Sequence, residues 1–110
     1  MSADSKEERV GTQLDLGWLW DVLVSRRGAD PESSYTARLL AAGPDRIGRK
    51  IGEESAETII AGMRLQYAGA TPAELVGETA DLLYHLMVFL LALGVDPAEV
   101  MRELERRHRS

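Results

Sequence analysis

Two short clusters of carboxylates carry most of the chemical information in this 110-residue sequence. The first contains Glu53, Glu54 and Glu57 in GEESAE, and the second contains Glu78 and Asp81 in GETADLLYHL. Both stretches have helical patterns, in which residues three or four positions apart share a face. At about 100° per residue, the first three acids fall within about 100° of one surface and the second pair within about 60°. Each cluster can therefore present its carboxylates in one direction.

The chemistry of such clusters is that of a hard divalent metal. If the two helices pair side by side, four or five carboxylates converge and repel one another unless a cation lies between them. Mg²⁺ prefers carboxylates, waters and substrate phosphates in near-octahedral geometry. There it neutralises phosphate charge, orients a diphosphate and lowers the pKa of a bound water that attacks phosphorus. A spare carboxylate could act as general base. The carboxylates therefore predict a site for a hard divalent metal such as Mg²⁺, and hydrolysis within a nucleoside triphosphate tail would need all of these functions.

Each cluster also has a purely structural interpretation. The first could be a solvated helix face on which Lys50 forms weak surface ion pairs. The second is harder to explain in that way, because Glu78 and Asp81 are the only charges between Leu75 and Val95 apart from His85. Burying carboxylates is costly without a partner. Taken together, the two clusters favour a functional site.

Composition excludes several other classes of protein. The 18 acidic and 13 basic residues give no net positive field to attract a nucleic-acid backbone. The absence of cysteine excludes a disulfide framework and a thiolate zinc site, and fits a reducing cytoplasm. The polar start, MSADSKEERVGTQ, does not resemble a signal peptide. The most apolar run, Leu86–Leu93, is too short to span a bilayer. We therefore expect a cytoplasmic protein that binds neither nucleic acid nor membrane.

The fold class predicted from periodicity is all-α. Residues 1–13 are polar and aperiodic, which predicts a flexible tail, and residues 14–110 form a single domain. Apolar spacing, proline or polar residues at helix starts, capping boxes from Thr71 and Asp96, and glycine stops predict a bundle of about five helices. The expected ranges are Asp15–Arg27, Ser34–Ala42, Pro44–Tyr67, Thr71–Leu93 and Asp96–His108. No alternating pattern indicates a strand.

The helix expected over Thr71–Leu93 is apolar nearly all round its axis. Such a helix is buried on more than one side. A chain of this length has few other helices to cover it, and association would add burial. We therefore expect a bundle completed by oligomerisation, as a homodimer or a larger homo-oligomer.

Four segments of the chain resemble one family of enzymes. They are ADPESSYTARLL, GPDRIGRKIGEESAETIIA, GETADLLYHL and GVDPAEVMRELERRH, and they occur in the family's order and spacing. The chain resembles the phosphoribosyl-ATP pyrophosphatase family, within the all-α nucleoside triphosphate pyrophosphohydrolase superfamily that includes MazG-like proteins. The resemblance implies Mg²⁺-dependent hydrolysis of phosphoribosyl-ATP to phosphoribosyl-AMP and pyrophosphate, the second step of histidine biosynthesis.

The resemblance also implies roles for the five acids. The superfamily's metal-ligand pattern falls on Glu54, Glu57, Glu78 and Asp81. Glu53 is the adjacent acid that could bind a further metal or orient the attacking water. Which of these catalytic candidates is the general base does not follow from the pattern.

Basic and polar residues near the first cluster are candidate substrate contacts. Arginine suits bidentate contact with the second phosphate that the substrate carries on its added ribose. Lys50 could bind a phosphate or reduce repulsion among the acids, Ser34 could simply cap a helix, and Arg38 could be a solvated side chain. The full candidate set is Lys50, Arg38, Arg46, Arg49, Ser34, Tyr35 and Thr36. His85, on the stripe of Glu78 and Asp81, is expected to hydrogen-bond to an acid rather than to bind metal.

Two other functions remain open at this point. A MazG-like housecleaning pyrophosphohydrolase of ordinary or damaged deoxynucleoside triphosphates would use the same metal cluster. The segments SSYTARLL and GPDRIGRK favour phosphoribosyl-ATP instead. In a different class, a non-enzymatic helical dimerisation module would use the acids only for solubility.

Overall fold

The chain forms an all-α structure, which confirms the predicted fold class. The computed structural model describes residues 14–109. The polar tail expected over residues 1–13 lies outside this range. Over the described residues there are five helices and no strand: α2 (Leu16–Ser25), α3 (Tyr35–Ala42), α4 (Pro44–Tyr67), α5 (Pro72–Leu93) and α6 (Pro97–His108).

Local hydrogen bonds explain where three of these helices begin. The side chain of Asp15 accepts from the backbone N–H of Trp18 at 2.9 Å, and Ser34 accepts from that of Ala37 at 3.1 Å. At the start of α6, Asp96 accepts from Ala98 N–H at 2.8 Å. Each cap satisfies a backbone donor that has no partner within the helix. The helix bounds expected from the sequence agree with the structure to within about two residues, the usual uncertainty of helix ends.

The capping box predicted at Thr71 is wrong. Thr71 is the N-cap residue of α5, but its side chain makes no capping hydrogen bond. The expected partner, Glu74, instead accepts a hydrogen bond from Arg64 Nε of α4 at 2.9 Å. Pairing across the two helices has therefore replaced the local contact that the sequence pattern suggested.

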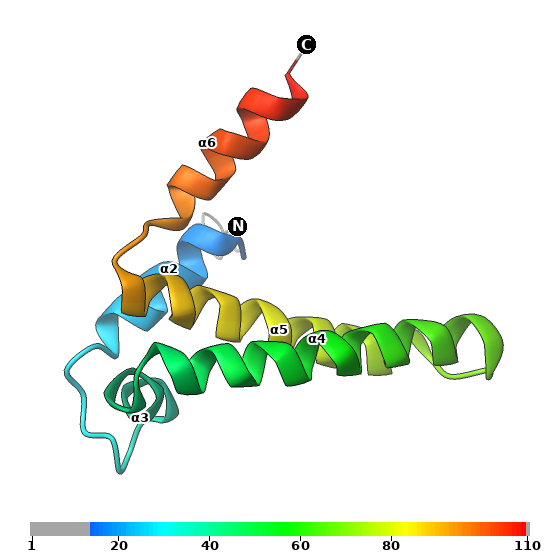
Figure 1. Cartoon of the computed structure of the whole chain (residues 1–110), viewed down its shortest axis with the longest axis horizontal. Helices are drawn as coiled ribbons and strands as arrows, with labels where there is room; N and C mark the ends of the chain where they lie inside the picture. Colours follow the sequence, from blue (N-terminus) through cyan, green and yellow to red (C-terminus); the bar gives the residue numbers. More distant parts are fainter. Residues whose placement is uncertain (1–13, 110) are drawn as a thin grey trace, which may run out of the picture.

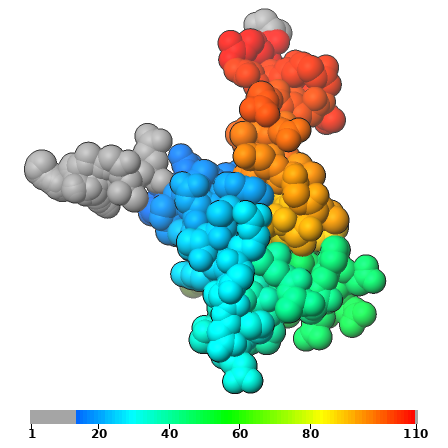
Figure 2. Space-filling model, turned by 90° about the vertical axis from the view of Figure 1, so that its left-hand side faces the viewer, coloured from blue at the N-terminus to red at the C-terminus, as the bar shows by residue number. Residues whose placement is uncertain are grey.

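Two long helices dominate the architecture. α4 and α5 lie alongside each other as an antiparallel hairpin and make the most extensive contact between any two elements (Figure 1). α2 packs against α5 near the hairpin's open end, and α3 contacts both α4 and α5 there. α6 contacts α2 and then projects away from the other helices, as Figures 1 and 2 both show. The hairpin thus supplies a rigid frame with one well-covered end.

The core lies at this covered end. Its buried side chains come from four helices and are Leu23, Leu39, Ile47, Met87, Val88 and Leu91. By length and composition alone, α5 is apolar enough to cross a membrane, with a mean hydropathy of 1.5 over its most apolar window. α5 contacts α2, α3 and α4, but only 22% of that window is buried in the described part of the chain. The core fixes the relative position of α4 and α5, on which both acidic clusters lie.

Candidate metal and substrate site

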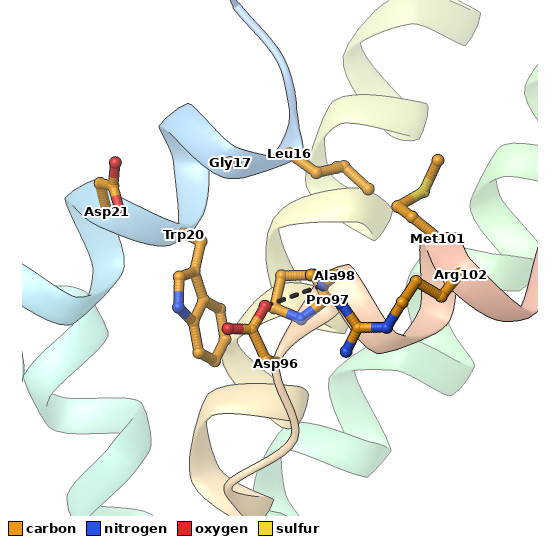
Figure 3. Close-up of a pocket in the computed structure, with 9 residues that line it drawn as sticks. All are labelled: Leu16, Gly17, Trp20, Asp21, Asp96, Pro97, Ala98, Met101 and Arg102. Carbon is orange, nitrogen blue, oxygen red and sulfur yellow. Dashed lines mark hydrogen bonds between the residues drawn. The ribbon is translucent and has the colours of Figure 1, made fainter.

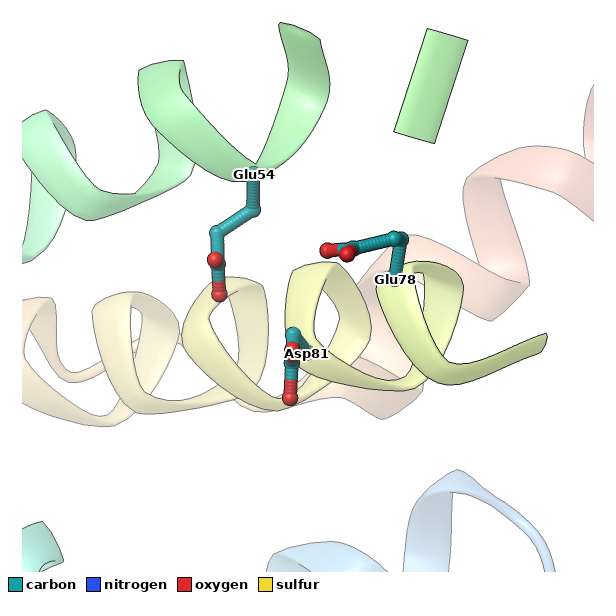
Figure 4. Close-up of side chains that lie close together, drawn as sticks. All are labelled: Glu54, Glu78 and Asp81. Carbon is teal, nitrogen blue, oxygen red and sulfur yellow. The ribbon is translucent and has the colours of Figure 1, made fainter. Parts of the chain in front are cut away.

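Three carboxylates from the two acidic clusters converge between the long helices. Glu54 extends from α4 toward α5, Glu78 extends from α5 toward Glu54, and Asp81 lies next to them on α5 (Figure 4). One oxygen atom from each of the three lies within 4.8 Å of the others. Their exposure differs, since Glu54 is buried, Glu78 is half-buried and Asp81 is exposed. The group therefore has a buried side and a side open to solvent.

The size and chemistry of this group fit a magnesium ion. Opposite ligands of Mg²⁺ lie roughly 4 Å apart, because each metal–oxygen distance is about 2.1 Å. The three oxygens occupy a region only slightly larger than that. Three carboxylates provide hard oxygen donors, and the exposed side leaves room for waters and a phosphate. The residues present are therefore suitable ligands for this metal.

The other two predicted acids lie at the edge of this group. Glu57 is exposed and lines a small pocket of about 140 Å³ together with Glu78. Glu53 is also exposed, and its carboxylate oxygen lies 3.8 Å from Lys50 Nζ. Neither belongs to the group of three converging carboxylates. Both can be reached by solvent or by a bound molecule.

The electrostatics of the group are most evident at Glu78. Its pKa is raised above the usual value of 4.5, first because packing removes water from around the carboxylate. Three neighbouring negative charges raise the pKa further, and these belong to Glu57, Asp81 and Glu54. Without a cation, Glu78 is therefore harder to ionise than a free glutamate. A divalent metal would relieve this repulsion.

His85 connects the acidic group to the helix α3. Its Nδ1 lies 2.8 Å from Glu54 Oε1 and 2.9 Å from the backbone oxygen of Asp81. Its Nε2 lies 3.0 Å from the hydroxyl of Tyr35. His85 is 5% exposed and Glu54 is 7% exposed. The histidine thus contacts an acid of α4 rather than the side chains of Glu78 and Asp81 on its own helix.

A basic pocket of about 260 Å³ opens on the other side of Tyr35. Its charged lining residues are Arg38 from α3 and Arg46 and Lys50 from α4. Tyr35, Leu39 and Ala42 complete the wall. The guanidinium of Arg38 lies 5.5 Å from the centre of the Tyr35 ring, within cation–π range. A pocket with three cations and few acids suits a phosphate group.

The structure gives the remaining candidate substrate residues different positions. Ser34 caps α3, and Thr36 is 1% exposed with its hydroxyl bonded to Tyr84. Arg49 is exposed and is not among the residues that line the basic pocket. Sequence analysis did not single out Tyr84, although it follows Asp81 by three positions and so shares its face of α5. This three-residue spacing was the sequence feature that could have identified Tyr84 as a neighbour of the acidic group.

A larger hollow of about 400 Å³ lies between α2 and the start of α6 (Figure 3). Trp20, Leu16 and Met101 line it, with Asp96 and Arg102 at its edge. It shares no lining residue with the acidic group or the basic pocket. The candidate site is therefore identified by its charged groups rather than by the volume of the hollow.

The all-α fold, with a cluster of three carboxylates between two antiparallel helices, places the chain in the class of candidate metal-binding helical proteins. Comparison with known proteins identifies the family within that class. Residues 17–108 match the family model described as phosphoribosyl-ATP pyrophosphohydrolase. The chain therefore belongs to that family of hydrolases, and the predicted resemblance is confirmed.

Individual relatives support the same membership. Proteins named phosphoribosyl-ATP pyrophosphatase from Trichlorobacter lovleyi and Cereibacter sphaeroides are 51% and 53% identical to it over 92 and 83 residues. These alignments cover 84% of the chain and 81% of the first relative, and 76% of the chain and 76% of the second. A relative of the same name from Granulibacter bethesdensis is 48% identical over 84% of the chain. The aligned region is 54% of that relative, so the chain spans about half its length.

Proposed function

We propose that the chain hydrolyses phosphoribosyl-ATP to phosphoribosyl-AMP and pyrophosphate, in histidine biosynthesis, and that the reaction depends on Mg²⁺. The observation that carries this proposal is the pairing of an acidic group with a basic pocket across Tyr35 and His85. Family membership and the printed names of the relatives support the choice of substrate.

The two halves of the site suit different parts of this substrate. Glu54, Glu78 and Asp81 would hold the metal, with Glu57 as a further ligand at the exposed edge. When bound, Mg²⁺ supplies charge neutralisation for the triphosphate and acidifies water. Glu53, which is exposed and precedes Glu54 in the sequence, would bind a further metal or orient the attacking water. The basic pocket would bind the phosphate on the added ribose through Arg38, Arg46 and Lys50.

A comparison of candidate substrates, each assayed separately, tests this function directly. Purified protein with Mg²⁺ would be incubated with phosphoribosyl-ATP and, separately, with the four deoxynucleoside triphosphates, and pyrophosphate release would be measured. We expect turnover of phosphoribosyl-ATP and its loss when EDTA is added. Turnover of the deoxynucleotides alone would instead identify a housecleaning pyrophosphohydrolase. Restoring growth of a histidine auxotroph that lacks this step would provide the corresponding test in cells.

We also propose that the active form is a homo-oligomer in the cytoplasm. Many large apolar side chains of the single chain are exposed, which is unusual unless a partner covers them. On the long helices and α6 they include Ile59, Ile60, Met63, Val76, Leu83, Leu86, Val100, Met101 and Leu104. A wholly apolar hollow of about 280 Å³ lies between α5 and α6, and shares Leu16 and Pro97 with the hollow in Figure 3. These exposed apolar side chains and the two adjoining hollows would fit a second copy of the chain.

A further inference from the structure

We propose that Tyr35 and His85 are positioning residues that hold Glu54 in its metal-binding orientation and connect it to the basic pocket. The chain of contacts runs from the Tyr35 hydroxyl to His85 Nε2, and from His85 Nδ1 to Glu54 Oε1. The inference rests on the proposed function, because it concerns the same acidic group and assigns it a supporting structure.

The hydrogen-bond partners of His85 determine which ring nitrogen carries the proton. Nδ1 faces two acceptors, the Glu54 carboxylate at 2.8 Å and the Asp81 backbone oxygen at 2.9 Å. An ionised carboxylate and a carbonyl can only accept, so Nδ1 must donate. In the neutral ring, Nε2 is then an acceptor, and the Tyr35 hydroxyl donates to it at 3.0 Å. The acceptors at Nδ1 therefore set the tautomer, and the Tyr35 hydroxyl holds the orientation of the ring.

Because Glu54 is buried, its contact with His85 determines how its carboxylate is oriented. The side chain of Glu54 is 9% exposed, so bulk water cannot freely solvate or reorient it. A buried carboxylate needs a polar partner, and the Nδ1 of His85 lies 2.8 Å from its Oε1 while also hydrogen-bonding the Asp81 backbone oxygen. Holding one oxygen on His85 leaves the other carboxylate oxygen available for a metal. Hydrogen bonds of this kind to metal-binding groups commonly set metal affinity.

Tyr35 also belongs to the basic pocket. It is 42% exposed, it lines the pocket, and Arg38 lies over its ring. A group bound there would contact the same residue whose hydroxyl holds His85. Tyr35 thus links the place where a phosphate binds to the orientation of a metal ligand.

The structure provides a matched control in the neighbouring pair of residues. Tyr84 on α5 hydrogen-bonds through its hydroxyl to Thr36 on α3, and its ring stacks on that of Tyr35 with centroids 6.0 Å apart. Both tyrosine hydroxyls therefore join the same two helices. Only the Tyr35 hydroxyl leads to His85 and Glu54.

Metal affinity measured without substrate tests the proposal. Mn²⁺, which favours the same oxygen ligands as Mg²⁺, would be titrated calorimetrically into the wild type and four variants. Loss of a hydrogen-bonding partner of this kind typically weakens metal affinity ~10–100-fold. We expect His85→Leu and Tyr35→Phe to fall in that range, with Tyr35→Phe at its lower end. Tyr84→Phe should stay within about twofold of the wild type, well below that range. His85→Asn should recover most of the loss, because its amide N–H lies near the Nδ1 position.

Several results would overturn the proposal. Equal weakening by Tyr35→Phe and Tyr84→Phe would mean that general packing of α3 on α5 sets affinity. Unchanged affinity in Tyr35→Phe, or no Mn²⁺ binding by the wild type, would also contradict it. If His85→Leu does not fold, as judged by its melting curve, the two tyrosine variants still decide. Phosphoribosyl-ATP turnover would be assayed separately. If this chain proves to act on another substrate, the Mn²⁺ titrations would still test the positioning role.

Discussion

At the scale of single residues, the raised pKa of Glu78 reflects the loss of water around its carboxylate and the electrostatic repulsion among the clustered carboxylates. Its raised pKa means that the folded protein holds this proton more tightly than the unfolded chain does. In metal-free protein, ionised Glu78 therefore destabilises the fold above its folded-state pKa, and protonation relieves this as the pH falls toward the usual value of 4.5.

Replacing Glu78 by glutamine should remove this pH dependence. We expect Glu78→Gln to be more stable than the wild type at neutral pH, with a gap in unfolding free energy that narrows as the pH falls toward the usual glutamate pKa. Urea denaturation in EDTA between about pH 4 and pH 7 would measure the gap. A gap that is constant with pH would contradict the assignment of repulsion to this carboxylate. With saturating Mg²⁺ present, the unfolding free energy of the wild type should rise relative to that of Glu78→Gln.

Asp81 and Glu57 test the metal assignment through activity. A metal ion contributes several kcal/mol of transition-state stabilisation, so losing a ligand should lower kcat on the order of 10²-fold or more. We expect this of Asp81→Asn and Glu57→Gln, with melting temperatures equal to or above the wild type because repulsion is relieved. Glu99→Gln, on the exposed first turn of α6, is the matched control and should retain activity. Full activity in both site variants would contradict the assignment of these two acids as metal ligands.

At the scale of the elements, the site depends on how firmly α2 holds the hairpin. Leu23 of α2 is fully buried in the core against α5 and its neighbours. Leu23→Ala should lower the unfolding free energy by about 3 kcal/mol through lost burial and the cavity that remains. The same substitution at Leu14, which is 78% exposed just before α2, should change it by less than about 0.5 kcal/mol. Thermal and urea denaturation would compare the two, and similar losses would contradict this core.

The elements were also what the sequence predicted best. Periodicity, prolines and glycines are local signals, and they located all five helices because each signal acts within one or two turns. The capping box predicted at Thr71 did not form, because the side chain of Glu74 instead accepts a hydrogen bond from Arg64, ten residues earlier in the sequence. The contact of Tyr35 with His85 spans fifty positions and depends on how α3 crosses α5, which no local pattern encodes. Spacing could suggest which acids share a face, but only packing determines which three converge.

At the scale of the whole molecule, many large apolar side chains within residues 14–109 are exposed. α6 contacts α2 and then extends away (Figure 1). Toward the far end of the hairpin, Ile59, Ile60, Met63 and Val76 are exposed. The covered end of the hairpin holds the core, and the acidic group lies along the same pair of helices. Association would cover the apolar surface without requiring the charged pocket to close. This separation allows the oligomer and the site to be tested independently.

Leu86 offers that test, since it is 38% exposed and lines the apolar hollow between α5 and α6. We expect sedimentation equilibrium at micromolar concentration to give a mass above that of one chain for the wild type. Leu86→Glu should shift the equilibrium toward monomer, because association would then bury an unpaired carboxylate at a cost of several kcal/mol. Leu14→Glu, in an exposed position outside that hollow, is the matched control and should leave the mass unchanged. A wild-type mass of one chain would contradict the proposed oligomer, and an associated Leu86→Glu would exclude this hollow from its interface.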